Sequence, residues 1–175
     1  YLMSMKVVQL TSDYEMKPFD CGDTELNGFL LNEAKAFSKN RLANTFLICD
    51  GDVIIGYFSL FNDKISKQEV SKAVWRKIKK LFPHSKHFGS YPAVKIGRFA
   101  IALQYRNCGM GRKMMVVLQY RLKKEISSST FRFLTVDAYL EAIPFYERNG
   151  FKRLDPEEIA GNTRTMFFDM MQLDF

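Results

Sequence analysis

The apolar positions along this chain alternate between the two-residue period of strands and the 3.6-residue period of helices. A β-prone run over Lys6–Leu10 is followed by a helical pattern over Thr24–Phe37. Asp23 or Thr24 can cap this helix, because either side-chain oxygen can accept an unpaired backbone N–H of the first turn. The apolar stripe of the helix consists of Leu26, Phe29, Leu30, Ala34 and Phe37. The pattern therefore predicts a strand that leads into a helix.

Two β-branched and aromatic runs, Thr45–Cys49 and Val53–Leu60, flank a short connector made of Asp50, Gly51 and Asp52. Glycine tolerates the positive φ that tight connectors need. These segments predict an antiparallel hairpin.

A lysine-rich helix is predicted over residues 67–82. Ser66 and Glu69 have the spacing of a capping box, and Pro83 ends the apolar stripe that follows. The stripe consists of Val70, Val74, Ile78, Leu81 and Phe82. The other face and the following loop carry Lys72, Arg76, Lys77, Lys79, Lys80, Lys86 and His87. This basic face is either simply solvated or a binding site for a polyanion.

The second half of the chain continues the alternation. A strand over Val94–Ile101, a glycine-containing segment over Arg106–Arg112 and a helix to about Ser127 follow one another. Further elements are strands at Phe133–Ala138, Phe151–Leu154 and Thr165–Leu173, and a short helix at Leu140–Asn149 that a left-handed Gly150 can end. No repeat, low-complexity tract or linker separates these elements. The pattern predicts an α/β fold with residues 1–175 in a single domain.

The composition is that of a soluble globular protein. Of the 175 residues, 47% are hydrophobic and 14% aromatic, which is ample for a core. No run approaches the roughly 18 apolar residues of a membrane span, and no export signal begins the chain. We therefore expect a cytoplasmic protein without a membrane partner.

The cysteines, the histidines and the net charge limit which bonds, metals and partners we expect. Cys21, Cys49 and Cys108 are odd in number and widely spaced, which fits reduced thiols, with Cys49 as a buried apolar side chain. His84 and His87 lack the further ligands of a tetrahedral site, so no metal is predicted. The net charge of +7 favours polyanions such as nucleic acid or a phosphorylated cofactor as partners.

The segment from Arg106 to Gly111 places Gly109 and Gly111 just before a helix and shortly after a strand. Glycine lets the backbone approach a bulky oxyanion, and the first N–H groups of a helix can bind a pyrophosphate. Arg106 and Arg112 add positive charge. The spacing fits neither a P-loop nor the dinucleotide fingerprint. The segment is thus either a phosphate-binding loop or a plain turn into the helix.

With its flanking strand Lys95–Ile101, this segment closely resembles motif A of the GNAT superfamily of N-acetyltransferases. A second segment resembles motif B of that family and consists of Val136, Asp137, Ala138, Ala142 and Phe145–Phe151. Thr163–Leu173, with Met166, is similar to its closing hairpin. The front half resembles the toxin-type branch at Phe19–Gly22, Leu26, Asn27, Phe29, Leu30, Ala34 and Ile55–Leu60. The resemblance covers nearly the whole chain.

The resemblance implies a GNAT-like fold, with a six- to seven-stranded mixed sheet flanked by about four helices. The fourth and fifth strands of that fold splay apart to admit the pantetheine arm of acetyl-CoA. Backbone groups of Phe99, Ala100 and Ile101 would bind the arm and the thioester. The pyrophosphate would be held by N–H groups across Arg106, Asn107, Cys108, Gly109, Met110, Gly111 and Arg112. Tyr139 stands where the family often has asparagine, which puts that residue's cofactor contact in doubt.

The resemblance also places Tyr146 beside the cofactor sulfur. A phenol has a pKa of about 10, near enough to that of a thiol for Tyr146 to act as the acid that protonates the departing thiolate. The alternative is that Tyr146 only packs, as Phe145 does. A backbone N–H near Ala100–Ile101 would stabilise the oxyanion. No general base is assigned to the nearby carboxylates, which belong to Asp137, Glu141 and Glu147.

These observations lead to the hypothesis of an acetyl-CoA-dependent N-acetyltransferase acting on a primary amine. The toxin-type branch resembles enzymes that acetylate the amino acid on charged tRNA, whose ester amine needs little help to lose its proton. Alternatives are a small-molecule amine, a protein N-terminus or lysine as acceptor, or a non-catalytic acyl-CoA-binding or RNA-binding module. The toxin-type resemblance implies a small antitoxin as partner, and dimers are common in the family.

Overall fold

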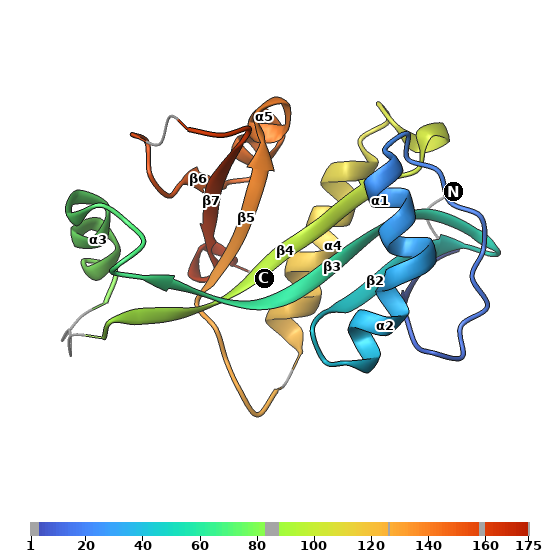
Figure 1. Ribbon diagram of the computed structural model, residues 1–175, viewed down its shortest axis with the longest axis horizontal. Helices are drawn as coiled ribbons and strands as arrows, with labels where there is room; N and C mark the ends of the chain where they lie inside the picture. Colours follow the sequence, from blue (N-terminus) through green and yellow to red (C-terminus); the bar gives the residue numbers. More distant parts are fainter. Residues whose placement is uncertain (1–3, 83–87, 126, 158–159, 175) are drawn as a thin grey trace. The chain divides into compact units, whose positions relative to one another are not determined.

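The computed structural model describes residues 4–82, 88–125, 127–157 and 160–174 (Figure 1). Pro83, His84, Lys86 and His87, considered above, lie outside the described residues. The chain divides into two compact units. The first consists of Tyr1–Phe61 with Ile96–Leu122, and the second of Asn62–Lys95 with Lys123–Phe175.

Across the described residues, seven strands form one sheet in the order β1-β2-β3-β4-β5-β7-β6. The strands are β1 (Met5–Gln9), β2 (Asn44–Asp50), β3 (Val53–Ser66), β4 (Ser90–Ile101), β5 (Phe133–Tyr139), β6 (Lys152–Arg153) and β7 (Thr163–Asp169). The long strands β3 and β4 run through both units. The expected fold class is confirmed.

The helices of the described chain are α1 (Thr24–Gly28), α2 (Ala34–Lys39), α3 (Lys72–Lys79), α4 (Met110–Lys124) and α5 (Ile143–Arg148). A π-helical turn at Phe29–Glu33 joins α1 to α2. Short 3-10 turns lie at Leu103–Tyr105, Leu140–Ala142 and Met170–Gln172. The helix expected over Leu140–Asn149 is therefore a 3-10 turn followed by α5, whose C-cap is Asn149, and Gly150 follows the cap at φ +87°, as predicted.

In the first unit, alternate residues of the central strands face two different layers. The side chains of Leu47, Cys49 and Tyr57 pack in a core under α1 and α2, together with Phe29 and Leu30. The intervening residues of β2 and β3 point to the opposite face, because side chains alternate across a strand. There Phe46 stacks on Phe58, and the guanidinium of Arg121 from α4 lies 4.6 Å from the Phe46 ring centre. The sheet is thus covered by α1 and α2 on one face and by α4 on the other (Figure 1).

The expected helix Thr24–Phe37 forms, but it is not continuous. Of the two candidate caps, Asp23 caps α1, and its Oδ1 accepts the Leu26 N–H at 3.1 Å. The π-helical turn then interrupts the regular pattern. Phe29, at the start of this turn, is stacked on Tyr57 and packs against Phe37. The burial of this ring in the core accompanies the local widening of the helix.

The expected hairpin is confirmed, although its second strand is much longer than predicted. β2 pairs antiparallel with β3 around a turn in which Gly51 has φ +57°. β3 continues to Ser66, because its distal part is buried in the second unit: Ile65 is 1% exposed, and Asp63 accepts a 2.6 Å hydrogen bond from Thr135 of β5.

The extension of β3 corrects the predicted start of the lysine-rich helix. Ser66 ends the strand and does not cap a helix, so the proposed capping box with Glu69 is wrong. Ser71 is the N-cap of α3, and its Oγ accepts the Val74 N–H at 3.2 Å. The predicted apolar stripe is confirmed only in part. Val74 and Ile78 are buried in the core of the second unit together with Trp75, which the prediction did not include, whereas Leu81 is 41% exposed.

The three cysteines are free thiols, with Cys21 and Cys49 buried and Cys108 exposed. No helix within the described ranges is long and apolar enough to cross a membrane. The described residues also hold no group of three or more side chains suited to a metal ion.

Candidate active site

The segment between β4 and α4 forms an exposed turn with two residues in the left-handed region. Asn107 has φ +57° and Gly109 has φ +77°, and both are exposed. Cys108 lies between them, and its Sγ donates to the Tyr105 carbonyl at 2.8 Å. The turn directs the chain from the strand into the first turn of α4.

The start of α4 leaves backbone donors at this turn. The first hydrogen bond of the helix runs from the Lys113 N–H to the Gly109 carbonyl at 3.2 Å. The N–H groups of Met110, Gly111 and Arg112 precede it, so helical geometry gives them no acceptor inside the helix. The positive end of the helix dipole lies at the same point. This arrangement can bind an anion, and it occurs at the residues predicted to do so.

Arg106 has a structural role that the sequence did not indicate. Its Nη2 donates to the Cys21 carbonyl at 2.6 Å, and the Leu103 N–H donates to the Asp20 carbonyl at 3.0 Å. Both bonds tie the turn before α4 to the segment that precedes α1. Part of the guanidinium of Arg106 therefore holds the loop in place, whereas Arg112 is exposed on the helix.

A compact hydrogen-bond network stabilises this supporting segment. Asp20 Oδ1 accepts the Gly22 N–H at 2.8 Å and Nδ2 of Asn27 at 2.9 Å, and Asn27 Oδ1 accepts the Cys21 N–H at 2.8 Å. The Gly22 and Asn27 bonds hold the pKa of Asp20 below its usual value. Asp20, Cys21 and Asn27, which belong to the toxin-type resemblance, thus fix the segment to which the turn before α4 is hydrogen-bonded.

The backbone of β4 divides its polar groups between the two edges of the strand. The Ala102 N–H donates to the Ile55 carbonyl of β3 at 2.8 Å, and a Cβ added at Gly56 would lie 2.7 Å from the Ala100 carbonyl oxygen. Since backbone groups alternate along a strand, the N–H and C=O groups of Phe99 and Ile101 point toward the opposite edge. Of the three predicted residues, these two are better oriented than Ala100 to meet a ligand outside the β3–β4 ladder.

Tyr146 lies in the second unit, on α5, and is 6% exposed. Its ring makes edge-to-face contacts with Phe145 and Phe151, with centroids 5.2 and 5.3 Å apart. Burial raises the pKa of the phenol above its ordinary value. Tyr146 therefore keeps its proton at neutral pH, which suits an acid and not a base.

The three carboxylates near motif B are either hydrogen-bonded to neighbouring strands or exposed to solvent. Asp137 accepts hydrogen bonds from Lys95 at 3.1 Å and Thr165 at 3.0 Å, so it links neighbouring strands. Glu141 and Glu147 are exposed. Tyr139 is 41% exposed at the end of β5. None of the three carboxylates has the burial that would mark it as a base.

Comparison with known proteins gives independent evidence on the family and the fold of this chain. A family model described as an acetyltransferase (GNAT) domain matches residues 29–171. A search of curated proteins finds no match.

Several solved structures share the fold of this chain. A bacterial toxin matches with a TM-score of 0.80 and 20% identity, covering 96% of this chain and 92% of that chain. AtaT complexed with acetyl-methionyl-tRNAfMet matches with a TM-score of 0.77 and 22% identity, covering 96% of each chain. A KacT mutant in which phenylalanine replaces a tyrosine matches with a TM-score of 0.76 and 21% identity, covering 97% of this chain and 96% of that chain.

Proposed function

We propose that this chain, which belongs to the GNAT acetyltransferase family, transfers the acetyl group of acetyl-CoA to a primary amine. The observation that carries the proposal is the exposed turn Arg106–Gly109, which leads from β4 into the first-turn amides of α4, which have no acceptor inside the helix. A pyrophosphate bound there would be held by the N–H groups across Arg106–Arg112. Acetyl-CoA is the substrate that the family uses, and the turn offers the donors that its pyrophosphate needs.

The reaction needs a neutral amine, a stabilised oxyanion and a proton for the departing thiolate. The amine nitrogen attacks the thioester carbon, and the carbon–sulfur bond breaks as the tetrahedral intermediate collapses. The N–H groups of Phe99 and Ile101 are candidates for binding the pantetheine arm and the oxyanion. Tyr146 donates its phenolic proton to the sulfur, and the proton lost by the amine passes to water. A thiolate in a dry site also has a raised pKa, so the buried phenol remains a suitable donor.

The acceptor that we propose is the amino group of an aminoacyl-tRNA. Structural likeness to AtaT complexed with acetyl-methionyl-tRNAfMet supports this assignment, and so does the net charge of +7. The exposed face of α3 carries Lys72, Arg76 and Lys77, its C-cap Lys80 is also exposed, and Val74, Trp75 and Ile78 of the other face are buried. Such a face can attract the phosphate backbone of RNA.

The same likeness supports a regulated, intracellular role. AtaT has been solved with the C-terminus of the antitoxin AtaR, and KacTA has been solved with DNA. We propose by analogy that a small antitoxin controls this chain in the cytoplasm, that residues 1–175 act as one domain, and that the enzyme forms a homodimer.

The direct test is release of CoA thiol from acetyl-CoA in the presence of charged tRNA, with the acetylated aminoacyl product identified by mass spectrometry. Charge reversal at Arg76, Lys77 and Lys80 should weaken activity on tRNA in a salt-dependent way and leave activity on small amines unchanged. Reversal at Lys39, Lys152 and Arg153, which are also exposed, is the matched control. Acetylation of small amines alone would redirect the assignment, and acetyl-CoA binding without any transfer would point to a non-catalytic module.

Tyr146→Phe tests the proposed acid. Loss of the proton donor should lower kcat by roughly 100-fold or more with little change in the KM for acetyl-CoA. Tyr91→Phe removes the same hydroxyl from a buried residue of the second unit, where it has no hydrogen-bond partner among the described residues, and should behave as wild type. Undiminished turnover by Tyr146→Phe would remove this residue from the mechanism.

A further inference from the structure

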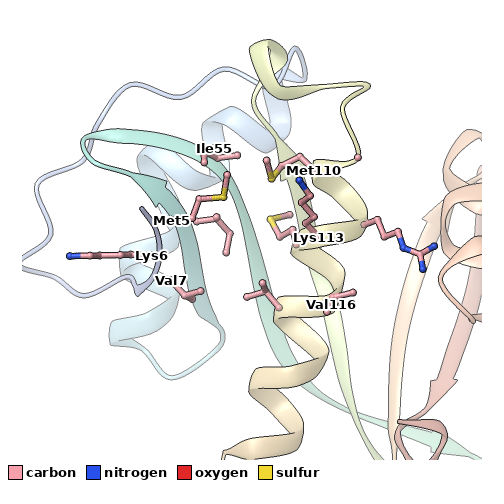
Figure 2. A pocket seen from close by; sticks show the side chains of 12 residues that line it. Met5, Lys6, Val7, Ile55, Met110, Lys113 and Val116 are labelled. Atoms are coloured by element: carbon pink, nitrogen blue, oxygen red, sulfur yellow. The ribbon is translucent and has the colours of Figure 1, made fainter. Parts of the chain in front are cut away.

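The two faces of the sheet in the first unit differ in chemistry. On the α4 side lies an apolar cavity of about 670 Å³, on which the side chains of Met5, Ile55 and Met110 converge (Figure 2). On the α1 side lies the guanidinium of Arg98 from β4, 4.5 Å from the ring centre of Phe29, which is buried in the core under α1 and α2. A polar group that approaches β4 from the α1 side therefore meets a charged hydrogen-bond donor.

Arg98 is held in place by its own strand and by α1. Its Nη1 donates to the Gly97 carbonyl at 3.0 Å, and its Nη2 lies 3.3 Å from Oε1 of Glu25. The Phe29 ring supports the face of the guanidinium. The side chain of Arg98 is 27% exposed and that of Glu25 is 61% exposed. The positive charge is thus fixed in position and can still be reached by a ligand.

The guanidinium of Arg98 keeps donors that these contacts do not use. Each Nη carries a second N–H beyond the one that faces Gly97 or Glu25, because a guanidinium is a fixed fork of N–H donors. Its Nε is buried and has no hydrogen-bond partner among the described residues. A guanidinium with unused donors favours a ligand that brings an oxygen acceptor.

The place of Arg98 along β4 links it to the acetyl transfer, and this step rests on the proposed function. Arg98 immediately precedes Phe99, whose backbone is a candidate for holding the thioester. The proposed pyrophosphate turn leads into α4, which covers the opposite face of the sheet from α1 (Figure 1). Acetyl-CoA bound at that turn reaches Phe99 from the α4 side. The attacking amine needs the face of the thioester that the cofactor leaves open, so it approaches from the α1 side.

We propose that Arg98, paired with Glu25, binds the carbonyl oxygen next to the acceptor amine and so selects α-amino acyl esters and amides as acceptors. The free N–H groups of the Arg98 fork donate to this oxygen, and the contact orients the amine toward the thioester carbon. An aminoacyl-tRNA carries such a carbonyl in its ester bond, whereas a simple alkylamine lacks it. Arg98 is thus a specificity-determining residue for the acceptor.

Glu25 distinguishes a neutral carbonyl from a carboxylate. The Arg98–Glu25 pair has no net charge, so it offers hydrogen-bond donors without a net attraction for anions. The carboxylate of a free amino acid would lie beside the carboxylate of Glu25, and like charges repel at such short range. An ester or amide carbonyl meets no such repulsion. The pair therefore rejects free amino acids, which would otherwise compete with charged tRNA for the acetyl group.

The first test compares two acceptors that differ only in the carbonyl. One is an RNA minihelix that carries methionine through its natural ester, and the other carries the same amine through an ether without the carbonyl. We expect Arg98→Gln to lower kcat/KM by about 10- to 100-fold for the ester, which loses a charge-assisted hydrogen bond, and by less than about twofold for the ether. Each acceptor is compared with itself in the two proteins, so the different pKa values of the two amines cancel.

Arg121→Gln is the matched control. The guanidinium of Arg121 also lies against a phenylalanine ring, 4.6 Å from the centre of Phe46, and its Nε is likewise buried without a partner in the described part of the chain. Because it belongs to α4 on the opposite face of the sheet, Arg121→Gln should use both acceptors as wild type does. Arg98→Lys keeps the charge but loses the fork, so it should restore part of the rate with the ester.

The role of Glu25 is tested with free methionine and methionine methyl ester as competitors of the methionylated minihelix, which reports their binding whether or not they are acetylated. Glu25→Gln removes the negative charge at nearly constant size, so it should strengthen inhibition by free methionine severalfold relative to the ester. Glu15→Gln makes the same change at a side chain that is 90% exposed and should leave the ratio unchanged. An unchanged ratio in Glu25→Gln, or no inhibition by free methionine, would refute selection by charge.

The outcomes with the minihelices separate this inference from the proposed function. Equal losses for ester and ether in Arg98→Gln would leave Arg98 a purely structural role and overturn the proposal. A loss in Arg121→Gln as large as that in Arg98→Gln would overturn it as well. Transfer by the wild type to neither minihelix would refute the proposed function together with the inference, whereas transfer that Arg98→Gln leaves unchanged would refute the inference alone.

Discussion

Replacing Gly109 with alanine isolates the contribution of one backbone angle to the proposed anion site. Gly109 has φ +77° and immediately precedes α4. An ideal Cβ built at this residue has no heavy atom within 4 Å, so alanine meets no clash with its surroundings. The substitution therefore tests conformational strain alone.

The magnitude follows from the cost of a left-handed backbone for a residue with a Cβ, which is about 1–2 kcal/mol. If the turn keeps its shape in Gly109→Ala, unfolding should require about 1–2 kcal/mol less free energy. If the free protein relaxes to a negative φ, the strain appears when acetyl-CoA restores the turn. The dissociation constant of acetyl-CoA then rises by about 5- to 30-fold. The loss of unfolding free energy and the loss of binding free energy should together add up to the strain of about 1–2 kcal/mol.

Urea unfolding and calorimetric titration with acetyl-CoA measure these two quantities. Gly51→Ala is the matched control, because Gly51 also has a positive φ of 57° and no heavy atom within 4 Å of its ideal Cβ. It lies in the β2–β3 turn, so it should lose similar stability and keep wild-type affinity for acetyl-CoA. Wild-type stability combined with wild-type affinity in Gly109→Ala would refute the assigned role of the turn.

Further substitutions test the framework around the site. Gly56→Ala should destabilise the first unit by about 1–3 kcal/mol and impair activity, because its Cβ would lie 2.7 Å from the Ala100 carbonyl oxygen. Gly28→Ala has open space on α1 and should be neutral or stabilising by about 0.5–1 kcal/mol; equal urea midpoints for the two variants would contradict this. Arg132→Met should cost about 1–3 kcal/mol, because Asp169, whose side chain is 9% exposed, loses the bonds of 2.6 and 2.9 Å from Arg132. Burial opposes ionisation of Asp169, but the Arg132 and Met171 bonds lower its pKa below the unfolded value. The wild-type stability from this pair should be present above pH about 4 and be lost as the pH falls through the lower folded pKa, whereas Arg132→Met should show a flatter acid unfolding curve.

Local interactions explain which elements could be predicted from the sequence. The Asp23 cap, the hairpin turn at Gly51 and the stop at Gly150 each depend on groups only a few residues apart. The turn at Arg106–Gly109 was predictable for the same reason, because its glycine and the helix that follows are adjacent in the chain. Val74 and Ile78 of the apolar stripe of α3 were also predicted, since they lie four residues apart on a single helix face, whereas Trp75 was missed.

Elements that depend on distant contacts were predicted less well. β3 extends to Ser66 because Asp63 and Ile65 find partners and burial in the second unit, and this extension moves the helix cap from Ser66 to Ser71. The π-helical turn at Phe29 accompanies packing against Tyr57, which is distant in the sequence. Neither the contacts of β3 in the second unit nor the Phe29–Tyr57 contact can be recognised from residues that are close together in the sequence.

The sequence by itself determined the family, the α/β fold and the location of the turn before α4, because each rests on residue types at short, fixed spacings. The tertiary structure decided how the predicted site residues are held and oriented. It committed Arg106 to the Cys21 carbonyl, directed Phe99 and Ile101 away from β3, and buried Tyr146 so that its phenol stays protonated. Such properties depend on contacts between segments that are distant in the sequence; Arg106 and Cys21, for example, are 85 residues apart. Burial of the core brings these segments together, so no single segment reveals the contact by its own sequence.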